Sequence, residues 1–211
     1  MTMQQHDTRV RPPQSPTIAN VSEPSQEKTP DATPDIVRVM CEPVRWRSYG
    51  LLHGIGPLRA AQLAKRVSVS EASMLKHLEM LEQIGFVEAD PESSSVPRHR
   101  YWRAIPGGLR LTDAIESTQP ELMRQWMQVF VQSLNLVMRQ WAQEEETWPL
   151  DWRHASQNYD FWMHLTSDEL NTFTGELLDV ARKWDVLSRH RSRVEGAKPV
   201  YAALNAFPVK E

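Results

Sequence analysis

The sequence is poor in the residues that build covalent or metal-bound scaffolds. Cys41 is the only cysteine among 211 residues, so the chain has no internal disulfide and no cage of several cysteines for a metal ion. No apolar run approaches the ~20 residues of a membrane span, and the N-terminus has no basic region followed by an apolar stretch. We therefore expect a cytoplasmic protein without a membrane partner.

The common signatures of catalysis are also missing. The sequence has no phosphate-binding glycine-rich loop, no nucleophile elbow and no pair of metal ligands at helical spacing. Pro106-Gly107-Gly108 has the composition of a linker turn rather than of a phosphate cradle. We expect no enzymatic activity and no cofactor.

The first 34 residues hold six of the 15 prolines among polar and charged residues. Such a segment cannot bury enough surface to offset its ordering entropy. We interpret residues 1–34 as a disordered tail, although Arg9 and Arg11 could also form an arm that contacts a partner. The remaining chain, within a total that is 40% hydrophobic, is long enough for one or two domains.

Residues 35–110 have the pattern of a small helical domain that ends in a β-hairpin. A first helix begins near Pro43, a second spans about 59–67, and Ser70 supplies the N-cap of a third that ends at Gly85. Short strand-like segments follow at 86–89 and 100–103. Three helices followed by a hairpin make a winged helix-turn-helix, and the whole chain is predicted to be mainly α, within an α+β class.

The third helix, over 70–85, has two different sides. Met74, Leu78 and Leu81 recur at helical spacing and can pack on a domain, while Ser73, Lys76 and His77 point elsewhere. We expect Leu75 to pack in the domain, with a place at the groove edge against thymine methyl groups as the alternative. The other side can enter a DNA groove, helped by the basic hairpin, the wing of 86–104. The predicted DNA-binding residues are Ser68, Ser70, Glu71, Ser73, Lys76, His77, Arg98, His99 and Arg100.

Positive and negative residues are unevenly distributed along the chain, whose net charge is −3. Residues 35–110 carry 11 Lys and Arg against 8 Asp and Glu, whereas residues 111–211 carry 10 against 15. Because phosphate contacts dominate DNA affinity, the local excess of cations matters more than the whole-chain sum.

Residues 35 to about 104 resemble the winged-helix domain of bacterial ArsR-type transcription regulators. The matching residues are Ala61-Gln62-Leu63-Ala64, Val69-Ser70, Lys76-His77-Leu78, Leu81 and Gly85-Phe86-Val87. The resemblance implies a homodimer that binds double-stranded operator DNA, usually represses, and releases DNA on a signal. It covers about a third of the chain. Two residues depart from the family pattern: Arg59 stands where a Ser or Thr cap is frequent, and Leu75 replaces a small polar residue.

Metal sensors of that family use clustered cysteines, or Asp and His pairs on a C-terminal helix. This chain reproduces neither arrangement, and Cys41 with His53 is a weak pair. We expect no metal site, although His154, His164 or His190 could contribute to one between subunits. A winged helix that binds another protein, without specific DNA, is the alternative function.

Residues 111–211 are predicted to form a dimerisation and sensing domain. Pro120 opens a long helix to about residue 146 whose apolar stripe is too wide for one surface facing one core. A second copy of the chain is the simplest partner, and a larger core within the chain that covers both faces is the alternative. Its predicted dimerisation residues are Leu122, Trp126, Phe130, Val137 and Trp141.

Thr166 and Glu169 have capping-box spacing and predict a further helix. The flanking segments, Tyr159 to Leu165 and Pro199 to Phe207, are predicted to pair as a small two-stranded element. Six of the eight tryptophans lie in this half. They could line a pocket for a small-molecule effector, but packing in the core or in a dimer is the more common use.

Overall fold

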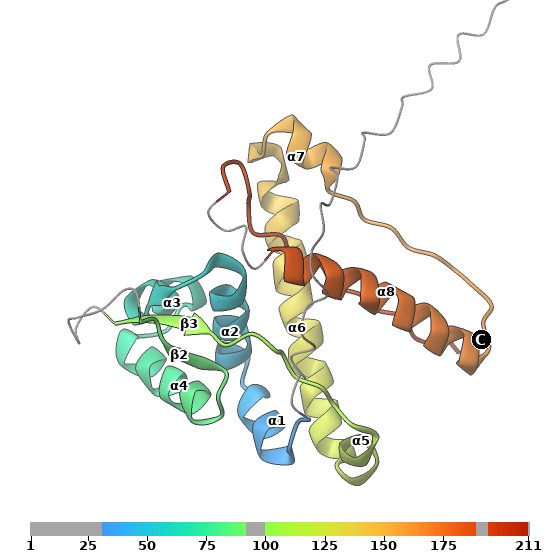
Figure 1. The fold of residues 1–211 in the computed structure, drawn as a ribbon, viewed down its shortest axis with the longest axis horizontal. Coiled ribbons are helices and arrows are strands. Elements are labelled where there is room, and N and C mark those ends of the chain that lie inside the picture. The colour runs from blue at the N-terminus through green and yellow to red at the C-terminus, as the bar shows by residue number, and fades with distance from the viewer. Residues whose placement is uncertain (1–30, 92–99, 189–193, 211) are drawn as a thin grey trace, which may run out of the picture.

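The computed structural model describes residues 31–91, 100–188 and 194–210. This part of the chain is mainly helical, as predicted, with one small antiparallel sheet (Figure 1). The helices are α1 (Pro34–Met40), α2 (Pro43–Ile55), α3 (Ala60–Val67), α4 (Glu71–Gln83), α5 (Asp113–Thr118), α6 (Pro120–Glu144), α7 (Leu150–Ala155) and α8 (Ser167–Ser188). The strands are β1 (Leu58–Arg59), β2 (Val87–Ala89) and β3 (Tyr101–Ala104), in the order β1-β3-β2.

Residues 31–34 belong to the folded part, which corrects the predicted end of the tail. Ala32 is buried in a cluster with side chains of α1, α5 and α6. The Thr33 hydroxyl accepts a hydrogen bond of 3.3 Å from the Ile36 N–H, and Pro34 occupies the first turn of α1. Thr-Pro is a helix start because threonine caps the free N–H groups and proline already has a helical φ. The rest of the predicted tail lies outside the described residues.

Helices α2, α3 and α4 pack around one apolar core. In α4 the predicted inward residues Met74, Leu78 and Leu81 are all fully buried. The sheet closes the core from another side, since Leu58 of β1 pairs with Trp102 of β3 and both are buried. The predicted limits of α4 are confirmed: Ser70 is its N-cap, and Gly85 follows it with a positive φ of 75°.

The first half of α6 packs against this core through Trp126 and contributes Leu122 to a second, smaller cluster. Leu122 is buried against Ala32, Val37 and Ile115. Trp126 meets Trp46 of α2 edge to face, with ring centroids 4.8 Å apart. Contacts therefore cross the expected domain boundary at residues 110 and 111.

The C-terminal part is much less buried. Helix α8 has no buried residue, although its predicted capping box is present: Thr166 N–H donates to Glu169 Oε2 (2.8 Å) and Glu169 N–H to Thr166 Oγ1 (3.3 Å). The C-terminal end lies beside the start of α8 (Figure 1), where Pro208 and Val209 line a cavity together with Thr166 and Glu169.

The prediction that Tyr159 to Leu165 pairs with Pro199 to Phe207 is wrong, because neither segment forms a strand. Their large apolar side chains are instead exposed, with Trp162 at 80% and Phe207 at 72%. Apolar, β-prone residues show that a segment needs burial, but they do not identify the surface that buries it. No helix in the described ranges is both long enough and apolar enough to span a membrane.

Candidate nucleic-acid interface

A tight turn joins α3 to α4 and fixes how α4 is presented. Ser68 adopts the left-handed conformation with φ of 60°, and its N–H bonds to the Ala64 carbonyl at the end of α3. The Ser70 hydroxyl accepts a 3.1 Å hydrogen bond from the Ser73 N–H. Ser68, Ser70 and Glu71 are all exposed at this turn. The predicted DNA-binding residues of the turn thus surround the N-terminus of α4, where N–H groups and the helix dipole favour an anion.

The outer face of α4 carries both polar and apolar side chains. Lys76 is exposed on this face, together with Ala72, Glu79 and Gln83. Leu75 is 40% exposed, which corrects the expectation that it packs in the domain. At 100° per residue, Leu75 lies about a quarter turn away from buried Met74. An exposed leucine on this helix is free to contact an apolar group of a partner.

Ser73 and His77 lie at the border of α4 that faces α2. The Ser73 hydroxyl is 3.4 Å from His77 Nε2, and both side chains are partly buried. Burial lowers the pKa of His77, the cationic Arg45 of α2 lowers it further, and Glu42 opposes them. His77 Nδ1 is buried without a hydrogen-bond partner among the described residues. His77 therefore belongs partly to the α2–α4 contact, and its surroundings favour the neutral imidazole over the charged form.

The hairpin formed by β2 and β3 is anchored to α4 by Arg100. Its guanidinium forms a 2.5 Å ion pair with Glu82 of α4 and lies 4.0 Å above the Trp102 ring. Arg100 was predicted to contact DNA, but in this conformation its charge is used within the chain. Arg98 and His99, also predicted from the sequence, lie outside the described residues.

Further cations beside α4 come from α3. Lys65 and Arg66 are exposed in the last turn of α3, next to the turn that leads into α4. The prediction from sequence did not include them. The signal was available, because the first helix of a helix-turn-helix crosses the DNA backbone while the second enters the groove.

The predicted dimerisation residues are divided between two roles. Leu122 and Trp126 are taken by contacts within the chain, whereas Phe130 and Val137 are only half-buried. Trp141 is also half-buried and stacks at a tilt on Trp148, with centroids 6.3 Å apart. A second apolar stripe on α6 is exposed: it consists of Met127, Val131 and Met138. Since these residues are spaced i, i+4 and i+11, they form one line along the helix.

Metal ligands do not converge within the described ranges, where no group of three His, Cys, Asp or Glu side chains could hold an ion. Cys41 is partly buried, and this burial raises the pKa of its thiol, with Arg45 opposing the shift. A thiol held protonated in this way is a weak nucleophile and a weak metal ligand.

No protein-family model matches this sequence, and the search of curated proteins finds no match either.

Proposed function

We propose that this protein is a homodimeric, sequence-specific DNA-binding transcription regulator built on a winged helix-turn-helix. One observation carries the proposal: α4 presents the exposed Lys76 and a capped N-terminus beside a tight turn, with the exposed Lys65 and Arg66 of α3 next to it. Such a helix inserts into the major groove while neighbouring cations contact phosphates. Repression is the sign of regulation that the resemblance to ArsR-type regulators implies.

The order of elements supports the winged-helix interpretation. Along the chain, α2, β1, α3, α4, β2 and β3 follow one another, and β1 pairs with the last strand instead of with its neighbour. This pairing joins the segment before α3 to the hairpin. In a winged helix the hairpin is the wing, which reaches the backbone or the minor groove beside the recognition helix.

A second copy of the chain is the partner that α6 and α8 need. A 22-residue helix such as α8, with no buried residue, derives little stability from propensity alone. Two copies related by a two-fold axis would bury the exposed stripes and place two α4 helices in successive major grooves about 34 to 36 Å apart.

A protein-interaction module is the second candidate function, and the composition of the outer face of α4 favours it. Leu75 is 40% exposed there, Met80 is 39% exposed at the border toward α2, and Glu71 and Glu79 are exposed on the same helix. Carboxylates repel phosphates, whereas exposed apolar side chains are ordinary protein contacts.

Binding to a library of genomic fragments, followed by footprinting, separates the two functions. The proposal expects enriched fragments with two related half-sites spaced by one helical turn. Uniform weak binding that disappears at physiological salt, with no protected sequence, would contradict specific DNA recognition.

A further inference from the structure

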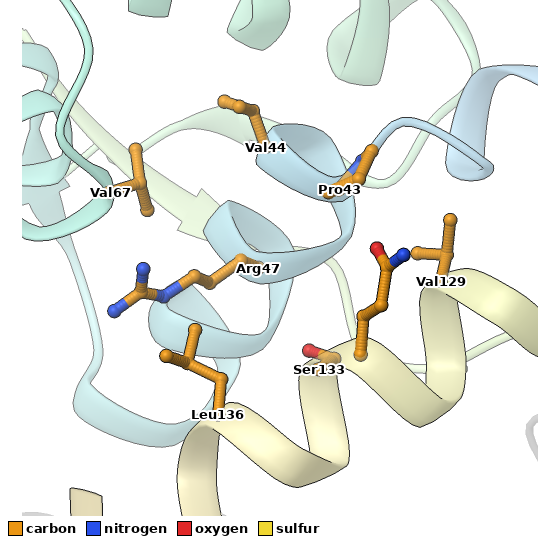
Figure 2. A pocket seen from close by; sticks show the side chains of 8 residues that line it. Pro43, Val44, Arg47, Val67, Val129, Ser133 and Leu136 are labelled. Carbon is orange, nitrogen blue, oxygen red and sulfur yellow. The ribbon is translucent and has the colours of Figure 1, made fainter. Parts of the chain in front are cut away.

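A cavity lies where the three-helix core meets α6. It has a volume of about 290 Å³ and is bordered by α2, the end of α3 and α6 (Figure 2). Its lining residues are Pro43, Val44, Arg47, Val67, Val129, Gln132, Ser133 and Leu136. This volume corresponds to about ten water molecules in the liquid and is near the lower limit of about 300 Å³ for small-molecule pockets. The cavity fits a ligand of the size of benzoate or hexanoate.

Its walls are apolar except for a few polar groups. Val67 and Val129 are 8% and 7% exposed, whereas Leu136 is 41% exposed, so the cavity is open to solvent on one side. Arg47 extends from α2 between Val67 of α3 and Leu136 of α6 (Figure 2). An apolar wall with one fixed charge binds molecules that combine a hydrocarbon body with an opposite charge.

No carboxylate of the chain is paired with Arg47 within the described residues. Several other arginines are ion-paired with a carboxylate: Arg38 with Asp35, Arg100 with Glu82, Arg103 with Glu88, Arg110 with Asp31, Arg124 with Glu121 and Arg182 with Asp179. For Arg47 the structure shows neither an ion pair nor a hydrogen bond among the described residues. A guanidinium has five N–H donors arranged to bind a carboxylate through two parallel hydrogen bonds.

We propose that this cavity binds a small apolar carboxylate, with Arg47 pairing with the carboxylate group. Val44, Val67, Val129 and Leu136 line the cavity and would contact the hydrocarbon part. The charge of Arg47 favours this occupant over a neutral molecule of the same shape.

The position of the cavity also couples it to DNA binding, a consequence that rests on the proposed function. Val67 is the last residue of α3 and directly precedes Ser68, whose left-handed conformation sets the direction of α4. Val129, Ser133 and Leu136 belong to α6, which carries the exposed dimerisation stripe. A ligand held between Val67 and α6 therefore changes the orientation of α4 relative to the dimer axis, and with it the half-site spacing that the protein fits.

Titration of the full-length protein with benzoate and hexanoate, each compared with its amide, tests the binding site without DNA. Methyl-labelled valine and leucine provide the NMR signals of Val44, Val67, Val129 and Leu136. We expect saturable shifts of these four signals with the carboxylates, and at least about tenfold weaker binding of the amides, because a charge-assisted hydrogen bond is lost. Equal binding of acids and amides, shifts confined to other methyl groups, or no saturable shift with either acid would each overturn the proposal.

Two variants test whether the charge of Arg47 and the open volume beside Ser133 are needed for binding. Arg47→Met is expected to reduce carboxylate affinity at least about tenfold, whereas the control Arg139→Met, an exposed arginine of α6 outside the cavity, keeps it. Ser133→Phe is expected to abolish binding by filling the cavity. Unchanged carboxylate affinity in Arg47→Met would show that Arg47 does not pair with the carboxylate. Since ligand binding is measured without DNA, its failure and a failure of DNA recognition are distinguishable.

Discussion

At the scale of single residues, α4 separates side chains that hold the fold from those that are free to bind. Ser70 and Ser73 are joined by the N-cap hydrogen bond, and His77 faces α2. Lys76 is exposed on the outer face of α4 and has no ion-pair partner within the described residues. Among the residues predicted on α4 itself, Lys76 is therefore the one whose charge is available to a phosphate.

Replacing Lys76 with alanine is expected to weaken DNA binding through the loss of one phosphate contact. Each cation that neutralises a phosphate releases condensed counterions, so the slope of log affinity against log salt should become less steep by about one. Fluorescence anisotropy with a bound fragment at several salt concentrations measures this slope. The control is Lys183→Ala in α8, which should leave the slope unchanged. Equal slopes in the two variants would show that Lys76 does not contact a phosphate.

The environment of His77 predicts a pH dependence of stability. Because the pKa of His77 in the folded protein lies below the ordinary value of 6.5, the unfolded chain binds the proton more readily as the pH falls below that value. The contribution of His77 is therefore complete above pH 6.5 and is lost as the pH falls toward the folded-state pKa.

Urea unfolding at a series of pH values tests this prediction with His77→Gln, which keeps a polar side chain but cannot titrate. The free energy of unfolding of the wild type should fall more steeply than that of His77→Gln as the pH decreases from about 7.5 to 5.5. His53→Gln is the matched control, since His53 is an exposed histidine of α2. Parallel curves for the wild type and His77→Gln would show that burial does not shift His77.

At the scale of elements, α6 packs on the core that α2, α3 and α4 share. Its link to α2 is the edge-to-face contact of Trp46 with Trp126. Trp126→Ala should lower the free energy of unfolding by about 3 kcal/mol. This value is the lower end of the range for replacing a buried aromatic residue with alanine, because Trp126 is only partly buried. A double-mutant cycle with Trp46→Ala should give a coupling of about 0.5 to 1.5 kcal/mol.

Trp184→Ala is the control for that experiment, since Trp184 is 51% exposed on α8. In a monomeric background its effect should stay within about 0.5 kcal/mol. Strictly additive effects of the two core variants would mean that the aromatic contact does not join α2 to α6.

Elements of different length were predictable to different degrees. The limits of α4 and the capping box at Thr166 follow from local chemistry, because a hydroxyl cap, a glycine in the left-handed region and helical spacing are all visible in the sequence. Strand β1 has two residues and α1 has seven, which is too short for periodicity to be recognised. The ion pair of Arg100 with Glu82 joins residues 18 positions apart, so only the fold reveals it.

At the scale of the whole molecule, burial is unevenly distributed along the chain. Most of the buried apolar side chains lie before residue 130, whereas large exposed ones continue through α6, α8 and the C-terminal segment. Soluble monomers rarely expose contiguous apolar patches larger than a few hundred Å². The line formed by Met127, Val131 and Met138 runs along α6, away from the α2 contact. This stripe is consistent with the predicted two-fold interface, but the residues differ from those chosen on the sequence alone.

In the proposed dimer, charges placed on this stripe should therefore separate the two copies without unfolding either. In Val131→Glu/Met138→Glu, each carboxylate would enter an apolar interface at a cost of several kcal/mol, so the dimer should dissociate at a concentration at least about 100-fold higher. Sedimentation equilibrium measures this change, with Gln125→Glu as a control that adds a charge to an exposed position of α6 away from the stripe. Circular dichroism should show unchanged helix content in all variants.

Fragments with two half-sites should lose affinity in the double variant, because each copy then binds one half-site alone. A double variant that stays dimeric would place the interface elsewhere, on α8 or the C-terminal segment.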